Sequence, residues 1–185
     1  MAASSHAPSP QPTDRPPDPG VWEIWWDGSY HPDGSAGLGI TLGRAGAPPM
    51  LQAAVPVRGS DATRVEALGP LLAALLLTGL LDPGPVAFHG DSAHVVRLLV
   101  GEDDPRDLHL FNCFSLTRDL LTGWPHTAMW HPRAENSACD ALAREAAQSG
   151  SVCCQCAWRL GNFVSARCSG IIGFECNKFV KRLCH

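Results

Sequence analysis

The sequence predicts an α/β domain built on a mixed five-stranded sheet, in which an antiparallel meander of three strands is joined by two further strands and flanked by helices. Two observations predict this fold class. Three short apolar runs follow one another, separated by turns rich in Gly, Pro and Asp, which is typical of a meander. After them, helical patterns alternate with short apolar runs, giving the expected order β-β-β-α-β-α-α-β-α.

Each expected element rests on its own pattern of residues. The strands are short and apolar, and they are expected at residues 21–27, 36–43, 50–57, 85–91 and 126–132. The helices show apolar residues at helical spacing, and they are expected at residues 63–81, 92–102, 107–124 and 137–148. Thr63 and Glu66 have the spacing of a capping box, and Asn136 is a candidate N-cap.

Composition divides the chain into three parts. Residues 1–20 are rich in Pro, Ser and Ala without apolar periodicity, so we expect a disordered leader. Residues 21–150 form the expected domain. Residues 151–185 hold six of the eight cysteines and both lysines, and we expect a basic, Cys-rich, disordered tail. A metal site there stays an alternative, although no C-x₂-C pair supports it, and so does a different coding origin of the segment.

Charge and length limit the classes of function. Residues 1–152 hold 9 basic against 17 acidic side chains, and residues 153–185 hold 5 against 1, so the bulk charge does not indicate nucleic-acid binding. The longest apolar stretch, 67–81, is shorter than a membrane span and contains Pro70. The N-terminus lacks a secretory pattern. We expect an intracellular monomer. The cytoplasm is the favoured compartment, and the nucleus and an organelle are the alternatives.

Four acidic residues stand out by their positions. Asp27 and Asp91 follow buried apolar strands, where a charge is unfavourable unless something neutralises it. Glu66 and Asp140 lie near the starts of helices that would pack beside those strands. Taken singly, each could be a turn, cap or ion-pair residue, as in an i,i+4 pair of Asp140 with Arg144. Carboxylates that converge repel each other, and Mg²⁺ prefers such oxygen ligands.

Four segments, in this order, resemble the ribonuclease H family. WWDGSYHPDGSAGLGITL resembles its first hairpin, whose Asp-Gly-Ser carries the first metal ligand. TRVEALGPLLAALLL resembles the helix with the glutamate, and FHGDSAHVVRLLVGE the strand-to-helix element with the second aspartate. MWHPRAENSACDALAREA resembles the closing segment with Pro-Arg, Asn and the last aspartate. The match covers residues 21–148.

The resemblance implies a ribonuclease H-like fold and an endonuclease that hydrolyses the RNA strand of RNA–DNA hybrids by a two-metal mechanism. It implies that Asp27, Glu66, Asp91 and Asp140 are the catalytic residues and metal ligands. The implied cofactor is two Mg²⁺ ions, for which Mn²⁺ can substitute. The implied partner is nucleic acid, with no membrane.

Other residues near these motifs have two interpretations each. Ser29 and Asn136 are candidate substrate contacts, or simply a turn and a cap residue. His131 is a candidate for proton transfer, or stands where an apolar strand residue is usual. Three tryptophans near these motifs are expected to lie in the core rather than to stack on substrate. They are Trp25, Trp26 and Trp130.

The match also departs from the family. Ala62, Thr63 and the His31-Pro32-Asp33 loop stand where many members carry asparagines that contact the hybrid's minor groove. Pro70, after Gly69, removes a helical hydrogen bond and could kink the helix and displace Glu66. The alternative function is therefore a catalytically weakened module that binds nucleic acid or protein. A proofreading-type exonuclease is excluded, because its first strand would carry Asp-x-Glu and Ser29 stands at that position.

The basic tail generates a prediction about affinity. Removal of residues 153–185 takes away 5 basic side chains, so affinity for a hybrid should fall and its dependence on salt concentration should flatten. Titration of a labelled hybrid at several salt concentrations measures both quantities. Unchanged affinity and slope would contradict the prediction.

Overall fold

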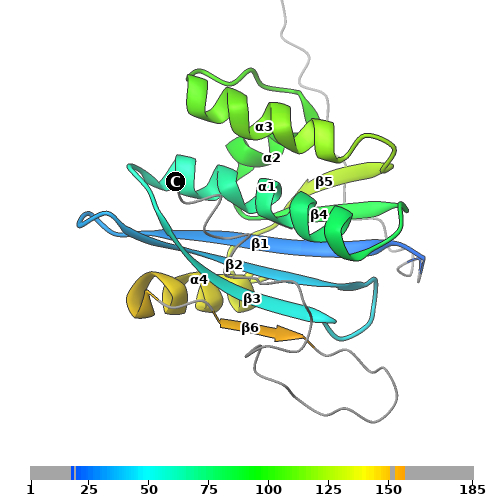
Figure 1. The fold of residues 1–185 in the computed structure, drawn as a ribbon, viewed down its shortest axis with the longest axis horizontal. Coiled ribbons are helices and arrows are strands. Elements are labelled where there is room, and N and C mark those ends of the chain that lie inside the picture. The colour runs from blue at the N-terminus through cyan, green and yellow to red at the C-terminus, as the bar shows by residue number, and fades with distance from the viewer. Residues whose placement is uncertain (1–17, 19, 151–152, 157–185) are drawn as a thin grey trace, which may run out of the picture.

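The computed structural model describes residues 18, 20–150 and 153–156 of the 185. Within this part a single mixed sheet has the strand order β5-β4-β1-β2-β3-β6 (Figure 1). The strands are β1 (Trp22–Tyr30), β2 (Ser35–Arg44), β3 (Leu51–Arg58), β4 (Val86–Gly90), β5 (His126–Trp130) and β6 (Cys153–Cys156). The helices are α1 (Ala62–Leu80), α2 (Ala93–Val100), α3 (Leu108–Leu120) and α4 (Ser137–Ser149).

The predicted five-stranded mixed sheet is confirmed. β1, β2 and β3 form the antiparallel meander, and β4 and β5 add in parallel on the other side of β1. A short sixth strand, β6, pairs antiparallel with β3, so the sheet extends past residue 150 into the segment assigned to the tail. The expected leader, apart from residues 18 and 20, and the rest of the expected tail lie outside the described residues.

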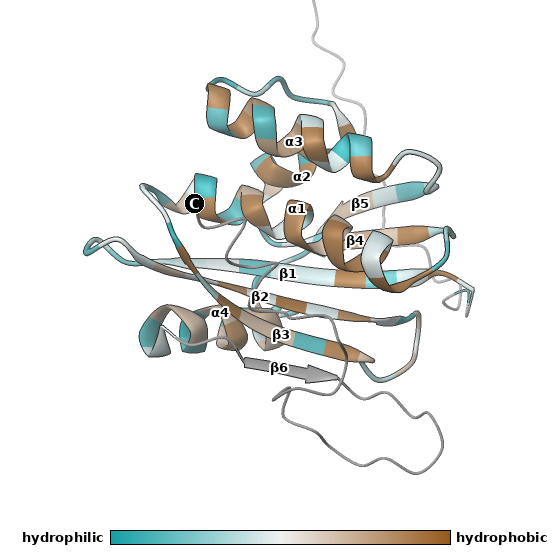
Figure 2. Ribbon diagram, viewed as in Figure 1, coloured by the Kyte–Doolittle hydropathy of each residue, from teal (hydrophilic) through white to brown (hydrophobic). Residues whose placement is uncertain are grey.

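Helices cover both faces of the sheet. α1, α2 and α3 lie on one face, with α3 outermost, and α4 lies on the other (Figure 1). α1 packs on β1 and β2, and α4 crosses β1, β2 and β3. Figure 2 shows hydrophobic colouring on α1 and α2, between α3 and the sheet. Apolar side chains that face α1 from the sheet are fully buried, among them Ile24, Trp26 and Phe88.

Glycines bring α4 and α1 close to the sheet. A Cβ at Gly39 would lie 2.0 Å from the carbonyl oxygen of Cys139 in α4, and one at Gly37 would lie 2.3 Å from that of Ala143. On the other face, a Cβ at Gly69 would lie 2.2 Å from the indole of Trp26. Helix backbone and a buried tryptophan therefore occupy the space that side chains would otherwise fill.

The predicted capping residues were partly wrong. Asp61, not Thr63, is the N-cap of α1, and its carboxylate accepts a hydrogen bond from the backbone N–H of Arg64 at 2.9 Å. Glu66 is therefore not part of a capping box, and its side chain is free to point elsewhere. Asn136 stands at the N-cap position of α4, but its side chain makes no capping hydrogen bond.

α1 (Ala62–Leu80) matches the helix predicted at residues 63–81 to within one residue. With 19 residues and a mean hydropathy of 1.4, it is the one helix among the described residues long and apolar enough to cross a membrane. However, 56% of its apolar window is buried inside the domain, and it packs against β1, β2 and α3. These contacts are those of a core helix.

The close approach of α4 to β2 generates a prediction. Gly39→Ala places a methyl group against the Cys139 carbonyl, and such overpacking should destabilise the fold by about 1–3 kcal/mol. Gly84→Ala is the matched control, because its Cβ would meet nothing closer than 3.9 Å. Urea denaturation measures both free energies of unfolding. Equal stability of the two variants would contradict the packing seen between α4 and β2.

Candidate metal centre

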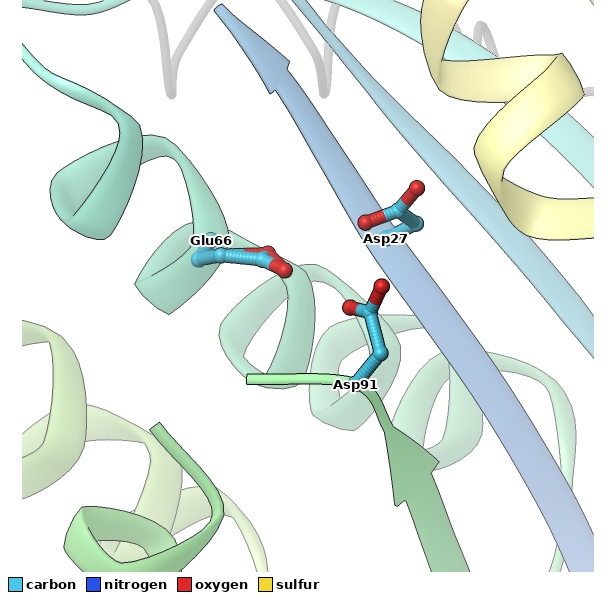
Figure 3. Close-up of side chains that lie close together, drawn as sticks. All are labelled: Asp27, Glu66 and Asp91. Carbon is cyan, nitrogen blue, oxygen red and sulfur yellow. The ribbon is translucent and has the colours of Figure 1, made fainter. Parts of the chain in front are cut away.

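Three of the four predicted carboxylates meet at one end of the sheet. Asp27 comes from β1, Glu66 from the first turns of α1, and Asp91 directly follows β4. One oxygen atom from each lies within 4.8 Å of the others, and the side chains point toward one another (Figure 3). The sequence analysis therefore placed these three residues together correctly.

Parallel pairing of β1 with β4 explains two members of the group. Trp25 pairs with His89, so the positions two residues further along each strand, Asp27 and Asp91, reach the same level of the sheet. β1 does not end at Asp27, as its sequence suggested, but continues to Tyr30. Asp27 thus lies within β1, where it pairs with Gly39 of β2, and 3% of it is exposed.

Close contact between β1 and α1 explains the third member. A Cβ at Gly28 would lie 3.0 Å from the backbone nitrogen of Glu66 and 3.1 Å from its Oε2. Because Gly28 has no side chain, the first turns of α1 can lie directly against β1. The Asp-Gly pair therefore supplies both a carboxylate and the space for a second one.

The Gly69-Pro70 pair does not displace Glu66. α1 runs unbroken from Ala62 to Leu80 with Pro70 inside it. A proline in a helix interior lowers helix stability by about 3 kcal/mol. Both residues of the pair are buried, however, and the indole of Trp26 occupies the space that a side chain at position 69 would fill. Packing against this tryptophan is the compensation that the sequence did not reveal.

The group is electrostatically unfavourable as it stands. Burial, and next the Asp91 carboxylate, raise the pKa of Asp27 above its usual range. Burial, and next Asp27 and Asp91, raise the pKa of Glu66 further still. Among the described residues, nothing donates a hydrogen bond to Asp27 Oδ2 or Glu66 Oε2, and both atoms are inaccessible to solvent.

These properties fit a divalent cation. Mg²⁺ takes carboxylate oxygens as ligands and keeps several waters, and the group offers oxygens only. A cation would satisfy the buried oxygens that lack partners and would offset the repulsion that raises the two pKa values. Asp27, Glu66 and Asp91 are therefore the residues that could hold such an ion.

Asp140 is not a member of this group. It lies in the first turn of α4, 4% exposed, and its carboxylate is paired with Arg133 and Arg144. The pair with Arg144 is the expected i,i+4 contact. Sequence reasoning missed Arg133, whose charge also lowers the pKa of Asp27 against the larger effect of burial. The Pro-Arg pair in the closing segment was the signal.

Asn136 and Ser29, the two candidate substrate contacts, differ in burial and in the element that carries them. Asn136 is 1% exposed, and its Nδ2 donates to the carbonyl oxygen of Trp26 at 2.8 Å. It thus ties the start of α4 to the residue before Asp27. Ser29 lies two residues beyond Asp27 on β1, half-buried and paired with Gly37.

His131 belongs to a hydrogen-bonded chain beside the group. Its Nε2 lies 2.9 Å from His89 Nδ1, and its Nδ1 lies 2.9 Å from Glu135 Oε2. Trp25 stacks on His89, with ring centroids 4.4 Å apart. Burial, and next His131, lower the pKa of His89 to about 4, so its ring is neutral at physiological pH. Only the outer end of this chain, at Glu135, is exposed.

Trp130 contradicts the expectation that it lies in the core. It is 53% exposed, whereas Trp26 is fully buried as expected. The indole Nε1 donates to the main-chain oxygen of Asp91 at 2.8 Å. β5 is the edge of the sheet, and an edge strand leaves its last side chain without a neighbouring strand to cover it.

Basic side chains line a hollow near the start of α1. It has a volume of about 290 Å³, and Arg58, Arg64 and His109 are in its wall. Arg64 is held there by Asp61 at 3.3 Å and Asp107 at 3.4 Å. Glu66 is two residues further along the same helix, and it is not part of the wall of this hollow.

The raised pKa values generate a prediction about cation binding. Because the folded state holds these protons more tightly than the unfolded chain, stability without metal should fall as pH rises above about 4. Mg²⁺ competes with the protons, so it should raise Tm by about 5–10 °C at saturation near pH 8 and by much less near pH 5.

Differential scanning calorimetry at matched ionic strength measures this shift. Asp91→Asn should abolish it, whereas Asp119→Asn, which changes an exposed carboxylate on α3, should keep it. A shift that is equal at the two pH values, or that survives in Asp91→Asn, would contradict cation binding at this group.

No family model and no curated protein sequence matches the chain. Solved structures do match. A ribonuclease H1 from the archaeon Halobacterium salinarum is 24% identical with a TM-score of 0.65, over 71% of this chain and 100% of that chain.

Two further structures are similar at the same level. The N-terminal ribonuclease H domain of a Mycobacterium tuberculosis protein is 22% identical with a TM-score of 0.64, over 71% of this chain and 99% of that one. LC11-RNase H1, solved in complex with an RNA/DNA hybrid, is 18% identical with a TM-score of 0.63, over 70% of this chain and 98% of that one. The sheet order, the helix placement and these neighbours together identify the described domain as a ribonuclease H-like fold.

Proposed function

We propose that this chain is a divalent-metal-dependent endonuclease that hydrolyses the RNA strand of RNA–DNA hybrids. The observation that carries the proposal is the meeting of Asp27, Glu66 and Asp91, whose oxygens lie within 4.8 Å of one another and include two buried atoms without partners. The RNA/DNA hybrid bound by the structurally similar LC11-RNase H1 supports the choice of substrate.

The chain's part in the reaction is to hold cations and substrate. Two Mg²⁺ ions held by Asp27, Glu66 and Asp91 would supply an activated water and would stabilise the leaving oxygen of a phosphodiester. Asp27 is central to the proposed ligand set, because it is 3% exposed and one of its oxygens lies within 4.8 Å of an oxygen of Glu66 and of Asp91. In-line attack at phosphorus breaks the bond to the 3′ oxygen, which gives a 3′-hydroxyl and a 5′-phosphate.

Asp140 is the proposed fourth ligand. Its carboxylate is buried and its charge is balanced by Arg133 and Arg144. An arginine and a cation compete for the same oxygens, so coordination by Asp140 requires at least one of these pairs to open. Arg133 has a side chain that is 70% exposed, which gives it the freedom to leave Asp140 and meet a substrate phosphate.

Contacts to the rest of the substrate are proposed for basic side chains. The hollow lined by Arg58, Arg64 and His109 offers positive charge to a phosphate, and phosphate contacts of this kind position a duplex without reading its sequence. Ser29, half-buried beyond Asp27, stays a proposed substrate contact. His131 stays a proposed proton-transfer residue, because the hydrogen bonds from His89 through His131 to Glu135 connect the interior to solvent.

A second candidate function is a binding module with weakened catalysis. The pairing of Asp140 with two arginines and the absence of asparagines at Ala62 and Thr63 favour it. Such a protein would bind a hybrid through the same surface without cutting it. Cleavage therefore separates the two functions. We propose a cytoplasmic monomer for either one, with the nucleus or an organelle as further possibilities.

Cleavage of a labelled hybrid tests the proposal. The wild-type protein should cut the RNA strand in Mg²⁺ or Mn²⁺ and stop when the metal is chelated. Asp27→Asn should lower kcat/KM by about 10²–10³-fold, because it removes a ligand whose cation supplies several kcal/mol. Its Tm without metal should equal or exceed that of the wild type, since one repelling charge is gone.

Controls separate catalysis from folding and from substrate choice. Asp119→Asn should cut like the wild type, because Asp119 is exposed on α3. A DNA duplex, single-stranded RNA and a DNA duplex with embedded ribonucleotides define the preferred substrate. Binding of the hybrid without cleavage by the wild type would contradict the nuclease and favour the binding module.

A further inference from the structure

Trp130 is an exposed aromatic residue at the candidate metal centre. Large apolar side chains that are well exposed in the described part of the chain are few, and they are Val100, Leu108, Phe111, Leu116, Met129 and Trp130. Of these, Met129 and Trp130 are on β5, whose end lies next to Asp91, and the others belong to α2 and α3. A large apolar surface left in water is unfavourable. Because the exposed ring of Trp130 lies beside Asp91, we looked to substrate binding for its function.

The indole is held in place by the residue that supplies a carboxylate. Trp130 pairs with Gly90 in the sheet, and its Nε1 donates to the main-chain oxygen of Asp91 at 2.8 Å. The backbone N–H of His131 donates to the oxygen of Gly90 at 2.9 Å. These bonds fix the ring relative to Asp91 and use its only polar atom, which leaves an apolar face toward solvent.

A fixed aromatic face is well suited to bind without a large entropic penalty. The side chain has two rotatable bonds, and the hydrogen bond to Asp91 already restricts them, so little freedom is lost when a ligand arrives. Asp91 links the two, because its main-chain oxygen holds the indole and its carboxylate belongs to the group that would meet a phosphate. Indole faces pack well on the sugars and bases of nucleic acids.

We propose that Trp130 is a substrate-binding residue whose indole face packs against the sugar of a nucleotide next to the cleaved phosphodiester. This inference rests on the proposed nuclease function. In a paired strand the bases stack on each other within the duplex, whereas the sugars are exposed along the minor groove. The ligand chemistry is therefore a pentose of the strand held at the carboxylates, and Trp130 positions that strand along the edge of the sheet.

Two substitutions separate the two features of Trp130. Trp130→Phe keeps an aromatic face but removes the N–H that bonds to Asp91. Trp130→Ala removes both. If the ring face binds substrate, Trp130→Phe should keep most of the affinity, and if Trp130 only anchors the Asp91 backbone, both variants should behave alike. Phe111→Ala is the matched control, because Phe111 is an equally exposed aromatic residue on α3.

Binding is measured by fluorescence anisotropy of a labelled hybrid with Asp27→Asn as the parent, in which turnover is expected to be slow. Trp130→Ala should weaken binding by roughly 5- to 150-fold, the effect of losing one aromatic contact with a nucleotide. The slope of log affinity against log salt should not change, since no charge is removed. Phe111→Ala should bind like the parent. In the otherwise wild-type protein, Trp130→Ala should raise KM more than it lowers kcat.

The outcomes distinguish this inference from the nuclease proposal. Unchanged affinity in Trp130→Ala, or equal losses in Trp130→Phe and Trp130→Ala, would overturn the role of the indole face while cleavage by the wild type still stands. A loss of the Mg²⁺-induced rise in Tm in Trp130→Ala would also overturn it, since the effect would then come from the carboxylate group. A wild-type protein that neither binds nor cuts the hybrid would overturn both proposals.

Discussion

The repulsion between Asp27, Glu66 and Asp91 limits the charge states that the candidate metal centre can adopt. Three acidic side chains with oxygens within 4.8 Å of one another cannot all be ionised in a buried place without positive charge between them. The pKa of Asp27 and that of Glu66 are raised for this reason together with burial. The fold thus holds an unfavourable arrangement in place, and such an arrangement is retained where a bound cation makes it useful.

The arrangement is rigid because elements from both faces of the sheet fix it. Parallel pairing of β1 and β4 sets Asp27 level with Asp91, and Gly28 lets α1 bring Glu66 against β1. On the opposite face, Asn136 joins α4 to the carbonyl of Trp26. Small residues and one buried amide hold the backbone on both sides of Asp27, so the carboxylates have little freedom to move apart.

Much of the fold and most of the candidate site could be predicted from the sequence. Strands show their apolar runs, and the ends of parallel strands meet at one edge, so the convergence of Asp27 and Asp91 followed from position alone. Glu66 was predicted with them despite Pro70, and the packing of Gly69 on Trp26, a long-range contact, explains why the helix stays intact there.

Other features depend on contacts that a sequence does not show. Asp61 caps α1 in place of Thr63, because either residue can serve and the backbone conformation decides between them. Trp130 was expected in the core, but β5 is an edge strand, and edge position is a property of the sheet order. The pairing of Asp140 with Arg133 depends on the turn before α4, which brings the two residues together.

A crystal structure of the protein soaked with Mn²⁺, with anomalous scattering recorded at the manganese edge, tests the central claim most directly. We expect anomalous peaks between the carboxylates of Asp27, Glu66 and Asp91, at distances normal for oxygen ligands of manganese. Carboxylates still clustered but without a peak between them, or manganese bound only elsewhere on the domain, would contradict it.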